Sequence, residues 1–229
     1  MHMDLKEKVV LVTGSSAGIG KETALAFSKK GCRTVVTYNS GREEGEKVHQ
    51  ECSRNSESLF LQLDVTSSES IRKAVEDTVK KFGRLDILVN NAGIIRWKHL
   101  IEQEESDIEA QIDVDLKGLI KMTRKALPTL HRQKEGMIIN IASMAGKRGY
   151  AELTVYCAAK FGVRGFTRAL AKELPDGIRT YCVNPGMTAT KMTGFKGVPP
   201  SEVAGIIIRT AEERLDKSSG EDVDVPDYL

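Results

Sequence analysis

The stretch that decides the fold reads Lys8-Val9-Val10-Leu11-Val12-Thr13-Gly14-Ser15-Ser16-Ala17-Gly18-Ile19-Gly20. Its apolar half, Lys8–Thr13, predicts a strand buried on both faces. The segment Gly18–Lys30 carries apolar residues between lysines and glutamates and stops before Gly31, which predicts a helix. The glycines allow a tight turn that can approach a phosphate, and the start of a helix offers free N–H groups. Because the spacing is G-x-x-x-G-x-G rather than G-x-G-x-x-G, an ordinary strand-to-helix turn is the alternative.

Short apolar runs and longer amphipathic segments alternate along the rest of the chain. The predicted strands are Lys8–Thr13, Arg33–Thr37, Leu59–Leu63, Leu85–Asn90, Met137–Ala142 and Ile178–Asn184, with a short one near Glu221–Val225. The predicted helices are Gly18–Lys30, Arg42–Arg54, one from a capping box at Thr66–Glu69 to Gly83, one from a capping box at Ser106–Glu109 to about His131, Leu153–Leu174 and Ser201–Arg214. This alternation predicts a Rossmann-like α/β fold, with a doubly wound parallel sheet between two helix layers. We expect a single domain over residues 1–229, with residues 1–3 set aside as start or cloning residues.

The charge and composition exclude several classes of protein. The 229 residues include 34 Lys and Arg against 32 Asp and Glu, and a net charge of +2 argues against a nucleic-acid partner. The aliphatic runs are too short to cross a bilayer, so no membrane partner is expected. The four cysteines and four histidines are scattered without metal-like spacing, so we expect no metal site. Free thiols and the lack of a leader segment are typical of a cytoplasmic protein.

Ligands of doubly wound sheets bind at the carboxyl ends of the strands, so the residues after each strand form the candidate site. Asn39 and Ser40 follow the second predicted strand, and no acidic residue precedes Glu43. An acidic side chain at this point usually holds the free ribose 2′-hydroxyl of NAD. Arg42 and the small polar groups could instead receive a 2′-phosphate. The segment therefore favours NADP(H) over NAD(H); the alternative is that Arg42 only opens a solvated helix.

Proton chemistry is predicted by a set of three residues in the second half of the chain. Tyr156 and Lys160 are four apart in a predicted helix, so their side chains share one face. An ammonium beside a phenol favours the phenolate and lowers its pKa. Ser143 follows the fifth predicted strand, at the same end of the sheet as the glycine turn, and its hydroxyl could hold a substrate oxygen.

Taken together, the motifs resemble those of the classical short-chain dehydrogenase/reductase family over nearly the whole chain. In order, they are Thr13–Gly20, Asp64-Val65, Asn90-Asn91-Ala92-Gly93, Ser143, Tyr156-x-x-x-Lys160 and Asn184-Pro185-Gly186. The chain looks most similar to the 3-oxoacyl-carrier-protein reductase type, with sugar and polyol dehydrogenases as the other similar branch.

The resemblance implies a role for each matching residue. Tyr156 would be the general acid and base, Lys160 would bind the nicotinamide ribose and hold the pKa of Tyr156 down, and Ser143 would bond the reacting oxygen. Asn90 would brace the sheet. The implied cofactor-binding residues are Gly14, Ser15, Ser16, Gly18, Ile19, Gly20, Asn39, Ser40, Arg42, Asp64, Val65, Asn91, Ala92, Gly93, Tyr156, Lys160, Pro185, Gly186, Thr188 and Thr190.

The chain departs from the family pattern in two places. The family's fourth catalytic residue is an Asn, and here Asp115 stands in its place. A carboxylate at Asp115 would raise the pKa of Tyr156 and shift the activity optimum to higher pH or lower the rate; a neutral exchange is the alternative. The substrate lid, residues 187–200, is short, which predicts an open pocket. The resemblance also implies a homodimer or homotetramer. This expectation is weaker here, because the chain departs from the glycine-rich tail that often contributes to assembly in the family.

The predicted function is an NADP(H)-dependent oxidoreductase that moves a hydride between nicotinamide and a small carbonyl or secondary alcohol substrate. An NAD-dependent sugar or polyol dehydrogenase is the alternative within the family. The alternative from another class is a dinucleotide-binding sensor without turnover, against which Ser143, Tyr156 and Lys160 argue.

Overall fold

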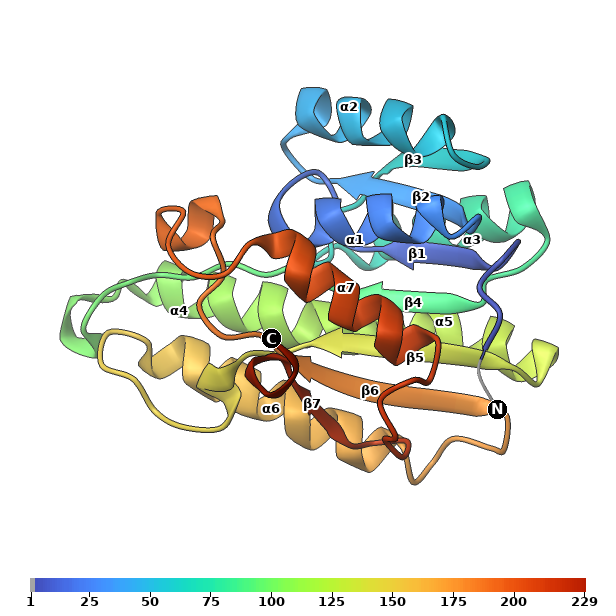
Figure 1. The fold of residues 1–229 in the computed structure, drawn as a ribbon. Coiled ribbons are helices and arrows are strands. Elements are labelled where there is room, and N and C mark those ends of the chain that lie inside the picture. The colour runs from blue at the N-terminus through green and yellow to red at the C-terminus, as the bar shows by residue number, and fades with distance from the viewer. Residues whose placement is uncertain (1–2) are drawn as a thin grey trace.

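The computed structural model describes residues 3–229, so residues 1 and 2 of the proposed start segment lie outside the described residues. All strand pairs of its seven-stranded sheet are parallel, in the order β3-β2-β1-β4-β5-β6-β7 (Figure 1). The strands are β1 (Val9–Val12), β2 (Arg33–Tyr38), β3 (Ser58–Gln62), β4 (Ile87–Asn90), β5 (Gly136–Ile141), β6 (Ile178–Asn184) and β7 (Asp222–Asp224). The strand order reverses between β1 and β4, and a sheet of this kind opens its ligand crevice at that switch point.

Within residues 3–229, seven α-helices accompany the sheet and complete the predicted three-layer Rossmann-like fold (Figure 1). They are α1 (Gly18–Lys29), α2 (Arg42–Ser53), α3 (Ser68–Phe82), α4 (Glu105–Ile112), α5 (Leu119–Gln133), α6 (Thr154–Leu170) and α7 (Pro200–Ala211). Apolar side chains of α1, α2 and α7 share one core with one face of the sheet, and those of α3, α5 and α6 share the other.

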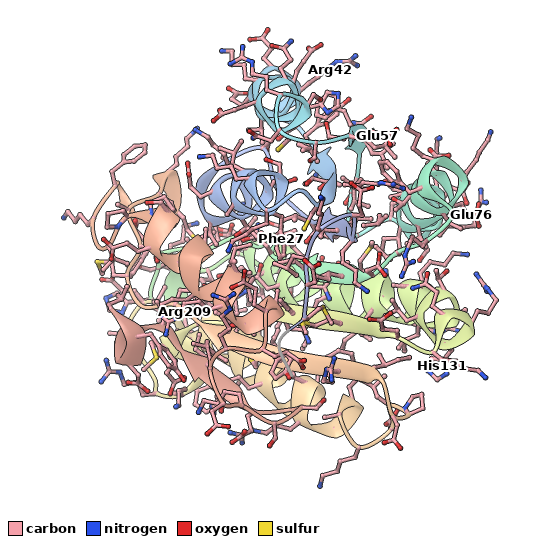
Figure 2. All side chains as sticks on the ribbon, turned by 45° about the vertical axis from the view of Figure 1, so that its right-hand side comes forward. Phe27, Arg42, Glu57, Glu76, His131 and Arg209 are labelled. Atoms are coloured by element: carbon pink, nitrogen blue, oxygen red, sulfur yellow. The ribbon has the colours of Figure 1, made fainter. Side chains whose placement is uncertain are left out.

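The β1 strand explains why its sequence is apolar without alternation. Val10 and Val12 pack into the core under α1 and α7, whereas Val9 and Leu11 pack into the core under α3 and α5. Each of the four residues is fully buried, because helices cover both faces of a parallel sheet. Figure 2 shows how apolar and charged side chains are separated: Phe27 of α1 lies inside the molecule, while the charged Arg42 and Glu76 lie at its periphery.

Both predicted capping boxes need correction. The side chain of Ser67, not that of Thr66, caps α3 by accepting a hydrogen bond from the Ser70 amide at 3.2 Å. Thr66 donates instead to Asp64 through its hydroxyl and amide. The box at Ser106–Glu109 is wrong, because the carbonyl of Glu104 already accepts the amides of Asp107 and Ile108 and starts the helix earlier.

Two long helices also differ from the prediction. The α6 helix ends at Leu170, because the amides of Lys172 and Glu173 bond three residues back and tighten the chain before Pro175. Between α4 and α5 lies a π-helical segment, Asp113–Gly118, which accounts for the interrupted pattern of apolar residues there.

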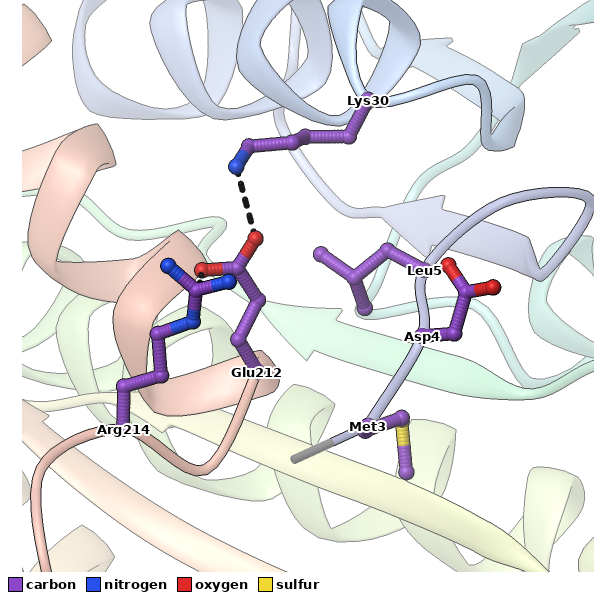
Figure 3. A pocket seen from close by; sticks show the side chains of 6 residues that line it. All are labelled: Met3, Asp4, Leu5, Lys30, Glu212 and Arg214. Carbon is purple, nitrogen blue, oxygen red and sulfur yellow. Dashed lines mark hydrogen bonds and ion pairs between the residues drawn. The ribbon is translucent and has the colours of Figure 1, made fainter. Parts of the chain in front are cut away.

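The N-terminal segment is tied to the end of α7 through Met3. The Met3 amide donates to the Glu212 carbonyl oxygen at 3.2 Å. Beside it, Lys30 and Arg214 pair with the Glu212 carboxylate at 2.6 and 3.1 Å around a hollow of about 300 Å³ (Figure 3). Both cations pair with the Glu212 carboxylate, so the residues around this hollow join the end of α1 to the segment after α7.

Candidate active site

A cavity of about 1010 Å³ opens at the carboxyl ends of the strands. It brings together residues from the segments that follow β1 to β6, which are far apart in the sequence. The predicted site residues that line it are Gly14, Ser16, Gly18, Ile19, Asn39, Ser40, Asp64, Val65, Asn91, Ala92, Gly93, Ser143, Tyr156, Lys160, Pro185, Gly186, Thr188 and Thr190.

Four predicted residues are not part of this lining. Ser15 is fully buried inside the turn after β1. A Cβ on Gly20 would lie 2.4 Å from the side-chain nitrogen of Asn91, so this glycine makes room for a neighbour. Arg42 begins α2 with an exposed side chain (Figure 2), and Asp115 lies behind the cavity wall. Ser15 and Gly20 shape the turn, and a cofactor contact of Ser15, Gly20 or Arg42 stays a prediction.

The glycine turn after β1 fits a dinucleotide phosphate. Gly14 and Gly18 have φ angles of +64° and +56°, which favour glycine. A Cβ on Gly14 would lie 3.1 Å from the Cα of Ala92, and one on Gly18 would lie 3.2 Å from Thr190. No side chain caps the N-terminus of α1, which begins at the cavity-lining Gly18, so its first amides can receive an anion.

Asn91 fixes the position of that turn. Its side-chain amide donates to the carbonyl oxygens of Thr13 and Gly14 at 2.8 and 3.2 Å. The hydroxyl of Thr13 accepts the amides of Asn91 and Ala92, both at 2.9 Å. These hydrogen bonds join the end of β1 to the end of β4. Asn91 thus supports the glycine turn, called the glycine cradle below, from inside the protein. Asn90 bonds Thr123 and Asn140 and joins β4 to α5 and β5.

Tyr156 and Lys160 lie one turn apart on α6 and are both buried. The Lys160 Nζ lies 5.4 Å from the centre of the Tyr156 ring and donates to the Ile141 carbonyl oxygen at 3.2 Å. Burial raises the pKa of Tyr156, while the charge of Lys160 and a hydrogen bond with Ser143 act against that rise. The arrangement puts a phenol, a hydroxyl and a cation at one point of the cavity wall.

The Asp115 carboxyl group is buried near Lys160 and does not line the cavity. Its Oδ1 accepts the Ile94 amide at 2.7 Å, and among residues 3–229 its Oδ2 has no hydrogen-bond partner. A Cβ on Gly93 would lie 3.1 Å from that Oδ1 and 3.5 Å from Lys160 Nζ, so both groups converge there.

Burial raises the pKa of Asp115 to about 6, although Lys160 and the Ile94 amide lower it. The negative charge of Asp115 raises the pKa of Tyr156, which is the direction expected from the sequence. The pKa of Lys160 is also raised, because attraction to Asp115 and Tyr156 outweighs the cost of its burial.

Asp115 reaches this position because it lies in the π-helical segment between α4 and α5. A π-helical turn is wider than an α-helical one and is frequent at functional sites. Gly118 lets the same segment approach Val65, since a Cβ on Gly118 would lie 2.9 Å from Val65. The segment reads as ordinary helix in the sequence, and only the drift in its apolar spacing signals the irregularity.

The mouth of the cavity carries an apolar rim, defined here as Trp97, Tyr150, Met187 and Met192. These side chains are 37–56% exposed although they are large and apolar. The Trp97 indole donates to the Met192 carbonyl oxygen at 3.2 Å and so connects the segment after β4 with the lid. Sequence reasoning includes Met187 and Met192 only as part of the lid, residues 187–200, because a methionine carries no motif.

The amino-acid sequence was compared with those of known proteins and protein families. A family model described as short chain dehydrogenase matches residues 8–197. The chain belongs to the short-chain dehydrogenase family. It is 41% identical over 218 residues to a 3-oxoacyl-[acyl-carrier-protein] reductase of Synechocystis sp., covering 89% of this chain and 88% of the relative. A reductase of the same name from Thermotoga maritima is 36% identical over 241 residues, 96% of each chain.

Family membership makes the protein an NAD(P)-dependent oxidoreductase. The glycine turn after β1 and the Tyr156, Lys160 and Ser143 side chains share one cavity, which makes this cavity the candidate active site. Within residues 3–229, no helix is long and apolar enough to cross a membrane. In the same part of the chain, no three His, Cys, Asp or Glu side chains gather as a metal site would require.

Proposed function

We propose that this protein is an NADPH-dependent reductase of 3-oxoacyl substrates, working on the β-carbonyl of an acyl thioester or ester. The observation that carries the proposal is the meeting of Ser143, Tyr156 and Lys160 in the cavity that also holds the glycine cradle. The names of the reductases at 36–41% identity support the substrate class.

A nicotinamide cofactor held in this cavity would supply the hydride for the carbonyl carbon. Tyr156 donates its phenolic proton to the carbonyl oxygen, and Ser143 donates a hydrogen bond to the same oxygen. The Lys160 ammonium then stabilises the phenolate that the proton transfer leaves behind. In the reverse direction, the Tyr156 phenolate accepts the proton of the alcohol. Exclusion of water by the buried wall strengthens each of these interactions.

A preference for NADPH over NADH is supported by the residues after β2. Asn39 and Ser40 line the cavity, and no carboxylate precedes Glu43 to hold a free 2′-hydroxyl. Arg42, at the first turn of α2, supplies a cation within the same segment. Titration of both reduced cofactors tests this: Arg42→Gln is expected to weaken NADPH binding about tenfold and leave NADH binding unchanged. Equal weakening of both would contradict a role for Arg42 at the 2′-phosphate.

The apolar rim supports an acyl substrate over a sugar or polyol. Apolar side chains at the cavity mouth favour a substrate with an alkyl chain, and a polyol would leave its hydroxyl groups without partners there. Assembly as a homodimer or homotetramer is a separate prediction from the family, for which sedimentation is the test.

The deciding experiment measures NADPH oxidation with a panel of β-keto esters, β-keto thioesters, diketones, quinones and sugars. Turnover that is fastest with the β-keto compounds is the expected result. Fastest turnover with sugars would favour a sugar dehydrogenase. Tight NADPH binding with no turnover on the whole panel would support the dinucleotide-binding sensor instead.

A further inference from the structure

The side chain of Arg164 continues the stripe of functional residues on α6. Tyr156, Lys160 and Arg164 follow one another at four-residue intervals, so they lie on one face of the helix. The Arg164 side chain is only 11% exposed and has a partner for each of its three nitrogens. It donates to the Gly146 carbonyl oxygen at 2.6 Å and to the two carboxylate oxygens of Asp222 at 3.0 and 2.6 Å. A guanidinium fork held at three points has one geometry.

Gly146 belongs to the turn that carries Ser143. This turn, Met144–Gly146, begins with Ser143 as its N-cap, whose hydroxyl accepts the Ala145 amide at 3.0 Å. A Cβ on Gly146 would lie 2.7 Å from the Lys160 carbonyl oxygen, so the turn rests directly on the α6 backbone. The contact from Arg164 therefore pins Ser143 against the helix that carries Tyr156 and Lys160.

Asp222 extends these contacts to the end of β6. It lies on β7 and also accepts the side-chain amide of Asn184 at 3.1 Å. Asn184 is the last residue of β6 and bonds Asp224 as well, at 2.8 Å. Directly after it, the Pro185 carbonyl oxygen accepts the Met144 amide at 2.9 Å. The network thus closes a ring through the Ser143 turn, the end of β6 and the C-terminal strand.

The charge state of Asp222 agrees with this network. Burial by itself raises the pKa of the Asp222 carboxyl. Hydrogen bonds from Arg164, Asn184 and Arg168 outweigh that effect and hold the pKa well below its usual range. The carboxylate is therefore charged at working pH, and the pairing with Arg164 persists.

We propose that Arg164 and Asp222 form a positioning clamp, which holds Ser143 at its working distance from Tyr156 and Lys160. The inference rests on the proposed roles of those three residues. Neither clamp residue lines the cavity, so neither touches a reacting atom. A displacement of a catalytic group by about 1 Å can cost up to about a hundredfold in rate, which is the effect the clamp prevents.

The chain provides a matched control in Arg168. Its guanidinium donates to the same Asp222 oxygen at 2.6 Å, but its side chain is 57% exposed. We expect Arg164→Gln to lower kcat about tenfold or more, with KM for the keto substrate and for NADPH changed less than twofold. Arg168→Gln should leave both constants within twofold. Equal losses of kcat in the two variants would overturn the proposal.

A second readout separates the clamp from the proposed catalysis. Hydrogen–deuterium exchange of the peptide that contains Ser143–Lys147 is expected to quicken about tenfold in Arg164→Gln and to stay unchanged in Arg168→Gln. Wild-type protein without turnover on any substrate would refute the proposed function, while the exchange data would still decide on the clamp. Unchanged exchange in Arg164→Gln would refute the clamp.

A conservative variant provides the control for misfolding. Arg164→Lys retains the cation beside Asp222 but cannot make all three contacts, so kcat should fall less than in Arg164→Gln. Should Arg164→Gln fail to fold, the same measurements on Arg164→Lys decide. Failure of both variants to fold would assign Arg164 to structural stability and overturn the positioning role.

Discussion

The wall and the mouth of the cavity differ in how firmly their side chains are held. Tyr156 and Lys160 at the wall, and Asp115 behind it, are only 1–9% exposed, so buried neighbours hold their positions. At the mouth, the apolar rim is 37–56% exposed, and Met187 and Met192 have flexible side chains. The difference teaches that this fold separates the chemistry from the choice of substrate. A substitution at the wall should change kcat, and one at the rim should change KM.

The largest effect is expected from removing the phenolic hydroxyl of Tyr156 at the wall. Tyr156→Phe keeps the ring in the buried cluster but has no proton to donate, so kcat should fall about 10³-fold. Steady-state kinetics with NADPH and a β-keto ester measures the loss. Cofactor binding, followed by NADPH fluorescence, should weaken less than threefold. Retention of more than a tenth of the wild-type kcat would contradict Tyr156 as the general acid.

The corresponding test at the mouth truncates an apolar side chain. Met192→Ala removes contact surface that we assign to the alkyl chain of the substrate, so KM for a long-chain β-keto ester should rise about tenfold. A β-keto ester with a short chain provides the control, and its KM should change less than twofold. Comparable changes for both chain lengths would show that Met192 does not contact the alkyl chain.

The wall was largely predictable from sequence because its residues come directly after strands. Parallel strands end at one edge of a sheet, so the glycine turn, Asn91, Ser143 and Pro185 had to meet there. The spacing of Tyr156 and Lys160 fixed their common helix face. Local periodicity and turn chemistry were sufficient for these elements and for the order of strands and helices.

The rim and the clamp were beyond the sequence for physical reasons. Met187 and Met192 carry no spacing signal, and they reach the mouth only through the fold of the lid. Arg164 and Asp222 are 58 positions apart and meet because β7 is the last strand of the sheet. The π-helical segment around Asp115 depends on tertiary packing, which helix propensity does not describe.

A third prediction tests whether charge behind the wall tunes the chemistry. Asp115→Asn can keep an oxygen toward the Ile94 amide but removes the negative charge that raises the pKa of Tyr156. The pKa of Tyr156 then falls, and its phenolate forms at lower pH. The rising limb of the pH profile for alcohol oxidation should therefore move to lower pH, and the rate at a fixed pH on that limb should rise. Profiles of kcat/KM for NADP-linked oxidation of a β-hydroxy ester measure the shift.

The matched control for Asp115 is a surface carboxylate on the same segment. The Asp113 side chain is 41% exposed and pairs with Lys117 at 2.7 Å, so Asp113→Asn removes an equal charge without touching the wall. Its pH profile should coincide with that of the wild type. Identical profiles and rates for Asp115→Asn and the wild type would mean that the aspartate is a neutral exchange for the family's asparagine.

The smallest expected effect concerns the single hydrogen bond within the rim. Trp97→Phe keeps an aromatic surface at the mouth but loses the indole N–H that bonds the Met192 carbonyl oxygen. An exposed hydrogen bond is worth about 1 kcal/mol or less, so KM for a long-chain substrate should rise only about twofold. Trp97→Ala, which also removes the ring, should raise the same KM about tenfold. A drop in kcat for Trp97→Phe, with KM unchanged, would mean that the lid positions catalytic groups and that wall and mouth are not independent.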